Sequence, residues 1–179
     1  MKTSFQIYST NERIFNEIID LYISAFPSSE RRTTADFASI LENDDRFNII
    51  VASFNSSFAG FISYWTFNDF IYIEHLAIVE SLRGNGLGSF LINQLTKCAD
   101  HLPILLEVEP DTDTISHNRI KFYNNLGFSV RNDIHYIQPP YALGKESIEL
   151  WIMTNSNISS TQLISFTENI KDVVYFSHY

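Results

Sequence analysis

The order of its predicted strands and helices places this 179-residue chain in the α/β (α+β) class. Three apolar strand-like runs follow one another between residues 47 and 79, in the order of a meander. A glycine-rich segment joins the last run to an amphipathic helix, and a further strand and helix follow. With 45% hydrophobic residues, including 15 Phe and 9 Tyr, the chain is long and apolar enough to bury a sizeable core.

The first part of the chain is predicted to form one strand and two helices. Phe5–Tyr8 has the composition of a short strand. Ser9–Glu12 matches a capping box, which opens a helix. A loop over Phe26–Arg32 leads to a second helix at about Thr34–Glu42. The apolar face of the first helix consists of Ile14, Ile18, Leu21 and Tyr22.

The central part is predicted to form three consecutive strands. They cover Phe47–Phe54, Phe58–Phe67 and Phe70–Val79, each rich in aromatic and β-branched residues. Turn-forming residues separate them at Asn55–Ser57 and at Asn68–Asp69. Short turns of this kind join neighbouring antiparallel strands, so the three strands are expected to lie side by side.

Helices and strands then alternate. A helix begins near Gly86 and runs to about Ala99, and Pro103–Val108 forms the next strand. An amphipathic helix follows, and Gly127 is placed where a glycine commonly ends a helix.

The last part is predicted to hold two strands and one more helix. Phe128–Arg131 and Ser147–Thr154 pair with each other, separated by a loop over Asn132–Glu146. Ser160 or Thr161 then caps a C-terminal helix. The apolar face of that helix consists of Leu163, Phe166, Ile170 and Val173.

The segment Leu82–Ser89 has glycines at positions 84, 86 and 88, between a strand and a helix. Alternate glycines let backbone N–H groups converge, and the start of the helix adds free donors and a positive dipole end. These features predict a site for a pyrophosphate or a similar anion. The Gly-Lys-Ser/Thr of a Walker loop and the G-x-G-x-x-G of a dinucleotide site are both missing. A glycine-rich turn without a ligand is the alternative.

A second motif lies downstream of this loop. Ser116–Phe128 ends in F-Y-x-x-x-G-F, after a predicted strand. Together with the R-x-x-G-x-G pattern of Arg83–Gly88, it resembles the GNAT superfamily of N-acetyltransferases. The resemblance implies the GNAT fold, a mixed, mainly antiparallel central sheet flanked by helices, here with an extra C-terminal helix. Residues 1–155 are expected to form the acetyltransferase domain. Residues 156–179 are expected to be a helical extension packed on that domain, with a dimer contact as the alternative.

The resemblance implies acetyl-CoA as co-substrate. A bulge in the third central strand would turn backbone groups toward pantetheine, and the glycine loop would bind the pyrophosphate. The residues expected to bind the cofactor are Leu76, Ala77, Ile78, Arg83, Gly84, Asn85, Gly86, Leu87, Gly88, Ser89 and Asn118. Family members often have Asn at the position of Ser116, and Asn118 is the candidate to replace it.

The resemblance also suggests the catalytic groups. Glu74 is the first candidate for the general base, because many family members have a Glu at about this point, and a carboxylate can remove a proton from the attacking amine. Strand alternation aims the neighbouring His75 at the opposite face. Tyr123 is the candidate acid that protonates the coenzyme A sulfur, since a phenol stays protonated at neutral pH. The alternatives are a solvated strand residue for Glu74 and a core aromatic for Tyr123.

The acceptor is expected to be a small-molecule amine or a peptide. Glu30 is a candidate substrate-binding residue or base, and it is equally compatible with a plain helix-entry charge. Tyr136 and Tyr141 are placed in a stiff wall that sets specificity. Two further candidate carboxylates are Glu107 and Glu109. Cys98 is expected in the core, so direct attack in a ternary complex is favoured over transfer through a cysteine.

Composition limits the remaining possibilities. A net charge of −9 argues against nucleic acid as a partner, and no apolar run approaches a membrane span. One cysteine excludes an internal disulfide and fits a cytoplasmic protein. No metal cluster is expected, and a monomer or homodimer is predicted. The main functional alternative is a catalytically inactive module that binds acyl-CoA. A structural or interaction protein built around the C-terminal helix is the third possibility.

Overall fold

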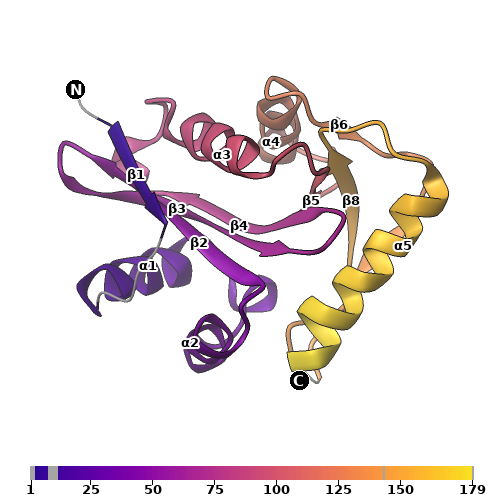
Figure 1. The fold of residues 1–179 in the computed structure, drawn as a ribbon, viewed down its shortest axis with the longest axis horizontal. Helices are drawn as coiled ribbons and strands as arrows, with labels where there is room; N and C mark the ends of the chain where they lie inside the picture. The colour runs from indigo at the N-terminus through magenta and orange to yellow at the C-terminus, as the bar shows by residue number, and fades with distance from the viewer. Residues whose placement is uncertain (1–2, 8–11, 143, 179) are drawn as a thin grey trace.

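The computed structural model describes residues 3–7, 12–142 and 144–178 (Figure 1). Its strands form one sheet in the order β1-β2-β3-β4-β5-β8-β6, and β7 pairs with β8 beside this order. The strands are β1 (Thr3–Ile7), β2 (Phe47–Phe54), β3 (Ser57–Thr66), β4 (Ile71–Ile78), β5 (Ile104–Val108), β6 (Ser129–Val130), β7 (Tyr136–Gln138) and β8 (Ile148–Thr154).

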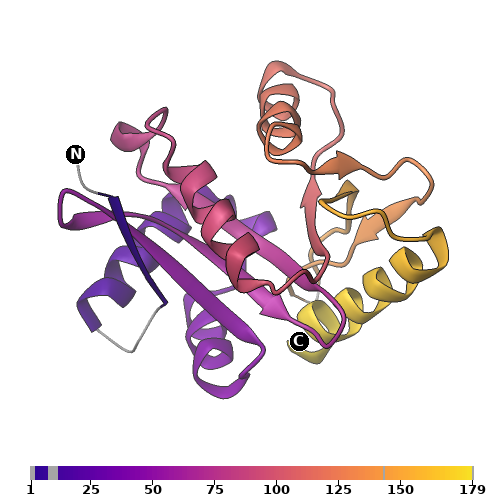
Figure 2. The same cartoon turned by 45° about the horizontal axis from the view of Figure 1, so that its top comes forward.

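The helices cover both faces of this sheet. The α-helices are α1 (Glu12–Ala25), α2 (Thr34–Asn43), α3 (Leu87–Cys98), α4 (Thr114–Asn124) and α5 (Ser160–Ile170). Short 3₁₀ turns are η1 (Ser28–Glu30), η2 (Glu80–Leu82) and η4 (Phe176–His178), and a π-helical turn, η3 (Lys171–Tyr175), continues α5. Figures 1 and 2 show α1 and α2 on one side of the central strands, α3 crossing the other side, and α5 running along β8.

The sheet is mixed and mainly antiparallel, as the family resemblance implied. β1–β2, β2–β3, β3–β4, β5–β8, β6–β8 and β7–β8 all pair antiparallel. β4 and β5 run parallel, from Ile71 opposite Ile104 to Ile73 opposite Leu106. This pairing ends there, so the next residues of the two strands, Glu74 and Glu107, lie where β4 and β5 separate.

A β-bulge in β4 lies at this point. Ser63 of β3 pairs with His75, whereas the next residue, Tyr64, pairs with Ile73, so Glu74 is the extra residue. A bulge interrupts the alternation of side chains along a strand. The prediction that His75 faces away from Glu74 is therefore wrong. Glu74 contacts Trp65, and His75 contacts the rings of Tyr22 and Phe26, all on the α1–α2 face of the sheet.

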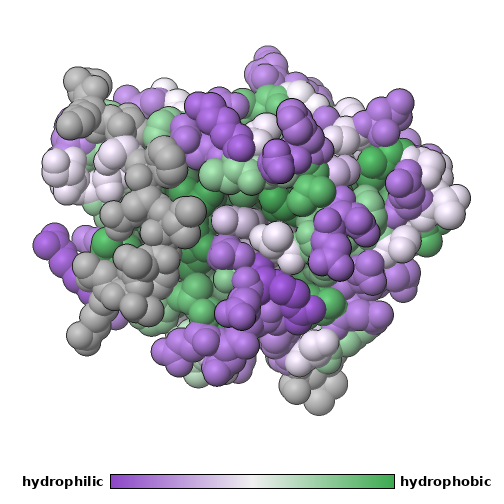
Figure 3. Space-filling model, viewed as in Figure 1, coloured by the Kyte–Doolittle hydropathy of each residue, from purple (hydrophilic) through white to green (hydrophobic). Residues whose placement is uncertain are grey.

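Two apolar clusters fill the interior, one on each face. The first packs α1, α2 and α5 against the sheet and is rich in aromatic rings, with Tyr22, Phe37 and Trp65 fully buried. The second packs α3 and α4 against the opposite face. On the surface in Figure 3, hydrophilic side chains dominate the periphery, and apolar side chains gather toward the middle.

Several predicted boundaries need correction. The predicted loop between the last strands contains β7, whose residues alternate between buried and exposed. Ser159, one residue before the predicted positions, caps α5 by accepting the N–H of Gln162. Tyr8 and residues 9–11, part of the predicted first strand and capping box, lie outside the described residues. The boundary after residue 155 stays a prediction.

Cys98 was expected in the core, and that expectation is wrong. The buried face of α3 runs through Leu87, Leu91 and Leu95, at four-residue spacing, and then continues at Ala99. Cys98 is one residue off this face and is exposed at the end of the helix. Within the described part of the chain, no helix has the length and hydrophobicity needed to cross a bilayer.

Candidate active site

A cavity of about 820 Å³ opens where β4 and β5 separate. One end is lined by the glycine-rich loop and by α4, and the other by the end of α1, η1, β5 and the segment 138–150. It therefore joins most of the predicted cofactor residues to two of the predicted acceptor residues, Glu30 and Tyr141. Among the described residues, no group of three or more His, Cys, Asp or Glu side chains is arranged to hold a metal ion.

The glycine loop has the geometry of an anion site. Gly84 and Gly86 have φ angles of 77° and 76°, a left-handed conformation that strains other residues. Gly86 is the N-cap of α3, so the N–H groups of the first helical turn have no acceptor within the helix. A Cβ on Gly88 would lie 3.2 Å from the Phe122 ring, so this glycine lets α3 and α4 approach closely. These features would fit a pyrophosphate.

Most predicted cofactor residues line the cavity. They are Leu76, Ala77, Ile78, Arg83, Gly84, Gly86, Leu87, Gly88, Ser89 and Asn118. Asn85 is different: its side-chain amide donates to the carbonyl oxygens of Leu82 at 3.0 Å and of Arg83 at 3.3 Å. Asn85 therefore closes the loop from within and does not line the cavity.

The start of α4 explains the departure at Ser116. Its hydroxyl oxygen accepts the N–H groups of Thr112 and Asp113, and the Asp113 carboxylate accepts the N–H groups of Ile115 and Ser116. Ser116 is therefore buried, and its side chain caps the N-terminus of α4. Asn118 lies on the exposed side of α4 and lines the cavity.

Tyr123 projects from α4 into the wall of the cavity. Its ring packs edge-on against Phe122 and Phe128, with centroids 5.0 and 5.9 Å away. Burial raises the pKa of the Tyr123 hydroxyl to about 12. The phenol therefore stays protonated at neutral pH and can serve as a proton donor.

Glu74 is held in a buried ion pair. A guanidinium nitrogen of Arg32 lies 3.2 Å from one carboxylate oxygen, and the indole N–H of Trp65 donates to the other at 2.7 Å. Burial alone would raise the pKa of Glu74, but the charge of Arg32 and these hydrogen bonds hold it below its usual value. A carboxylate in this setting stays ionised and is a weak proton acceptor, and the role predicted for Glu74 stays a prediction.

His75 also lines the cavity. Its Nε2 lies 3.3 Å from the carbonyl oxygen of Glu30, and its Nδ1 lies 3.5 Å from the Ser63 hydroxyl. Burial lowers the pKa of His75, so the imidazole is neutral at physiological pH. Both ring nitrogens of His75 therefore lie near a hydrogen-bond partner.

Glu107 is the second carboxylate at the separation of β4 and β5. The Tyr136 hydroxyl donates to one of its oxygens at 2.5 Å, and the Tyr175 hydroxyl donates to the other at 3.1 Å. Burial raises the pKa of Glu107 to about 7, although hydrogen bonds from Tyr136, Tyr175 and Tyr72 act to lower it. No ion pair joins Glu107 to a cation among the described residues. A pKa near the working pH is what general base catalysis requires.

The predicted acceptor residues fall into different places. Glu30 in η1 is partly exposed and lines the cavity, as does Tyr141, whose ring lies under the Arg32 guanidinium. Tyr136 does not form an acceptor wall: it is buried in β7 and binds Glu107. Glu109 lines the cavity too, in an ion pair with Arg119.

Sequence reasoning missed three residues of this site. Arg32 was placed in the loop before the second helix without a role of its own, and Tyr175 was outside the predicted apolar face of the last helix. Gln138 of β7 is buried and lines the cavity. In β7 the apolar Ile137 is exposed and the polar Gln138 is buried, so hydrophobic alternation along the chain contained no signal for Gln138.

Known proteins resemble the chain in sequence. Residues 11–128 match the sequence model of the Acetyltransferase (GNAT) family. The putative acetyltransferase YjbC of Bacillus subtilis (strain 168) is 40% identical over 72 residues, which are 39% of this chain and 36% of that protein. The match therefore spans about a third of that relative.

Solved structures resemble the fold. A putative acetyltransferase of the GNAT family from Bacteroides thetaiotaomicron has a TM-score of 0.88 and 27% identity, covering 96% of this chain and 98% of that one. An aminoglycoside 6'-N-acetyltransferase complexed with coenzyme A has a TM-score of 0.64 and 17% identity, covering 88% and 99%. With the family match over residues 11–128, the chain belongs to the GNAT acetyltransferase family.

Proposed function

We propose that this protein is an acetyl-CoA-dependent N-acetyltransferase that acts on a primary amine by direct attack in a ternary complex. The observation that supports this most strongly is that a single cavity joins the glycine loop to Tyr123 and Glu107. Its two ends offer one place for an anionic cofactor and another for a cationic acceptor.

The cofactor end fits acetyl-CoA, which supplies the activated acetyl group when bound. The glycine loop at the start of α3 would hold the pyrophosphate through backbone N–H groups and the helix dipole. Leu76, Ala77 and Ile78 lie on β4 beyond the last residue that pairs with β5. We therefore assign their backbone to contact pantetheine.

The acceptor end fits an amine. An alkylamine has a pKa near 10.4, so at neutral pH it must lose a proton before it attacks. Glu107 is the carboxylate that we assign to accept this proton, directly or through a water molecule. It replaces Glu74 in this role because Arg32 already compensates the charge of Glu74. Glu30 at the cavity rim is assigned to attract the ammonium group.

Tyr123 is assigned to donate its hydroxyl proton to the sulfur that leaves. No cysteine of the described residues lines the cavity, and Cys98 is exposed at the far end of α3. This arrangement supports direct attack by the amine.

The test is acetyl transfer from acetyl-CoA to a panel of acceptors. The panel contains aminoglycosides, polyamines, amino-acid amides and short peptides with free N-termini. Thiol release measures turnover, and mass spectrometry identifies the acetylated product. We expect turnover with at least one class, and a loss of about 10²–10⁴-fold in kcat for Glu107→Gln.

The matched control is Glu42→Gln, which makes the same chemical change on the exposed side of α2 and is expected to leave turnover unchanged. Binding of acetyl-CoA without transfer to any acceptor would refute the proposed activity and favour an inactive acyl-CoA-binding module. Full activity in Glu107→Gln would refute the assignment of the base.

A further inference from the structure

The end of the C-terminal helix changes its winding beside the active site. α5 ends at Ile170, and residues Lys171–Tyr175 continue it as the π-helical turn η3. In a regular α-helix, Val174 would follow Ile170 on the buried face, four residues later. The wider turn also brings the residue after it inward, so that Ile170, Val174 and Tyr175 are all fully buried. Turns of this type occur often at functional sites.

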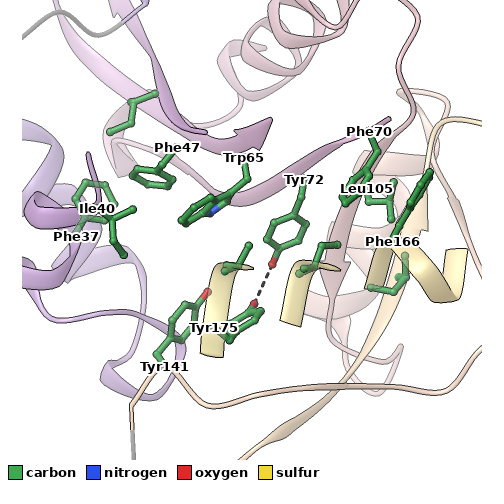
Figure 4. Close-up of a cluster of buried hydrophobic side chains, with 14 of the residues drawn as sticks. Phe37, Ile40, Phe47, Trp65, Phe70, Tyr72, Leu105, Tyr141, Phe166 and Tyr175 are labelled. Carbon is green, nitrogen blue, oxygen red and sulfur yellow. Dashed lines mark hydrogen bonds between the residues drawn. The ribbon is translucent and has the colours of Figure 1, made fainter. Parts of the chain in front are cut away.

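Tyr175 is buried next to the residues that line the acceptor end of the cavity. Its hydroxyl lies 3.1 Å from a carboxylate oxygen of Glu107 and 3.0 Å from the hydroxyl of Tyr72, as Figure 4 shows for the tyrosine pair. Its ring also packs against Tyr141, with the centroids 5.1 Å apart. Tyr175 thus contacts two residues that line the cavity, Glu107 and Tyr141.

Val174, the residue before Tyr175, contacts the ion pair between Arg32 and Glu74. The carbonyl oxygen of Val174 accepts a hydrogen bond from the Arg32 guanidinium, which forms the ion pair with Glu74. Two consecutive residues of η3 therefore hold both carboxylates at the separation of β4 and β5. Val174 acts on Glu74 through Arg32, and Tyr175 acts on Glu107 directly.

Two hydroxyl groups hold the oxygens of the Glu107 carboxylate directly, and the Tyr72 hydroxyl lies beside them. Tyr136 holds one oxygen from β7, and Tyr175 holds the other from η3. With only one of these bonds, the carboxylate could rotate about its terminal torsion, which is broad for glutamate. A small displacement of a proton acceptor from its productive position can reduce the rate strongly.

We propose that η3 is a positioning element of the active site and that Tyr175 is the positioning residue that orients Glu107 toward the acceptor amine. The proposal rests on the proposed function, in which Glu107 accepts a proton from that amine. It gives the C-terminal segment a catalytic purpose, beyond covering the sheet.

The groups around Glu107 determine the direction of the expected effect. Tyr72 and Glu74 face it from β4, Tyr136 from β7 and Tyr175 from η3, and the Arg32 charge is paired with Glu74. The hydroxyl donors stabilise the ionised carboxylate. Removing the Tyr175 hydroxyl is therefore expected to raise the pKa of Glu107 further above about 7.

The test compares Tyr175→Phe with Tyr64→Phe. Tyr64 is also a buried tyrosine of the core, but it belongs to the cluster on the opposite face of the sheet. The first measurement is the carboxyl ¹³C titration of the whole protein, in which Glu107 is identified by the signal that Glu107→Gln removes. The second is the pH profile of kcat/KM with the best acceptor.

In Tyr175→Phe we expect the Glu107 titration to move to higher pH and the acidic limb of the profile to move with it. We also expect kcat to fall by about 10- to 100-fold. Tyr64→Phe should leave both curves in place. Difluorotyrosine at position 175 keeps the shape of the tyrosine side chain and is a stronger hydrogen-bond donor, so it should move the Glu107 titration to lower pH. This variant replaces Tyr175→Phe in the test if the Phe variant does not fold.

An unchanged Glu107 titration in both position-175 variants would overturn the proposal. The titration needs no acceptor, so it tests the positioning role of Tyr175 separately from the proposed acetyltransferase activity. A titration that moves in a protein without acetyltransferase activity would support the positioning contact and refute the proposed function. Activity with a normal pH profile in Tyr175→Phe would refute the positioning role alone.

Discussion

Arg32 and Glu74 form a buried ion pair, with a nitrogen–oxygen distance of 3.2 Å and side-chain exposures of 2% and 1%. The Arg32 guanidinium lies over the rings of Trp65 and Tyr141, and the Trp65 indole donates to Glu74. The pair thus links the loop before α2 to the bulge in β4. Its charges balance inside an aromatic shell, and this leaves Glu107 as the carboxylate at this point without such a partner.

Arg32→Met is expected to destabilise the protein by about 3–5 kcal/mol, because it leaves the Glu74 charge buried without a partner. Urea denaturation at neutral pH measures this loss. In the double variant Arg32→Met/Glu74→Leu, most of the loss should disappear, since neither charge remains. A single-variant loss below about 1 kcal/mol would show that the pair is solvated in solution.

Glu107 should make the protein less stable as the pH rises. Its pKa in the folded protein is about 7, against an ordinary value of 4.5, so between these values the folded state holds a proton that the unfolded state has lost. The free energy of unfolding should therefore fall between about pH 4.5 and pH 7, by up to roughly 3 kcal/mol.

Glu107→Gln should remove this part of the pH dependence, and Glu42→Gln should keep it. Urea denaturation at a series of pH values measures the slope for all three proteins. Identical slopes in Glu107→Gln and the unmodified protein would mean that Glu107 titrates normally.

Tyr123→Phe is expected to lower kcat by about 10²–10⁴-fold and to leave acetyl-CoA affinity nearly unchanged, because the ring stays and only the proton donor is lost. Steady-state kinetics and calorimetry measure the two quantities. A lower melting temperature with normal kcat would instead identify Tyr123 as a core aromatic.

Gly86→Asp is expected to abolish measurable acetyl-CoA binding. The position has a left-handed φ of 76° and open space beside it, so the substitution strains the backbone and adds a negative charge at the start of α3. Gly127→Asp is the matched control, with a φ of 87° and no atom near the added Cβ. It should lose similar stability and still bind the cofactor in calorimetry. Equal affinities in the two folded variants would remove the glycine loop from the cofactor site.

Local patterns in the sequence were sufficient for most elements and for the glycine loop. The strands β2 and β5 and the helices α2 and α3 lie within a few residues of their predicted bounds, because apolar periodicity and turn residues act over short distances. Gly84 and Gly86 adopt a left-handed conformation, which glycine reaches without strain. Such features depend on neighbours in the chain, so the sequence alone determined them.

The acceptor end was decided by tertiary structure. The bulge at Glu74 depends on the register between β3 and β4, and it turned His75 to an unexpected face. Arg32 meets Val174 across 142 positions, and Tyr175 meets Glu107 across 68. Contacts of this kind arise only when several elements pack together, and burial then decides the charge state of each group. The sequence by itself therefore determined most of the fold and the glycine loop, whereas the packed structure decided that Glu74 is paired with Arg32 and that Glu107 is held by tyrosine hydroxyl groups.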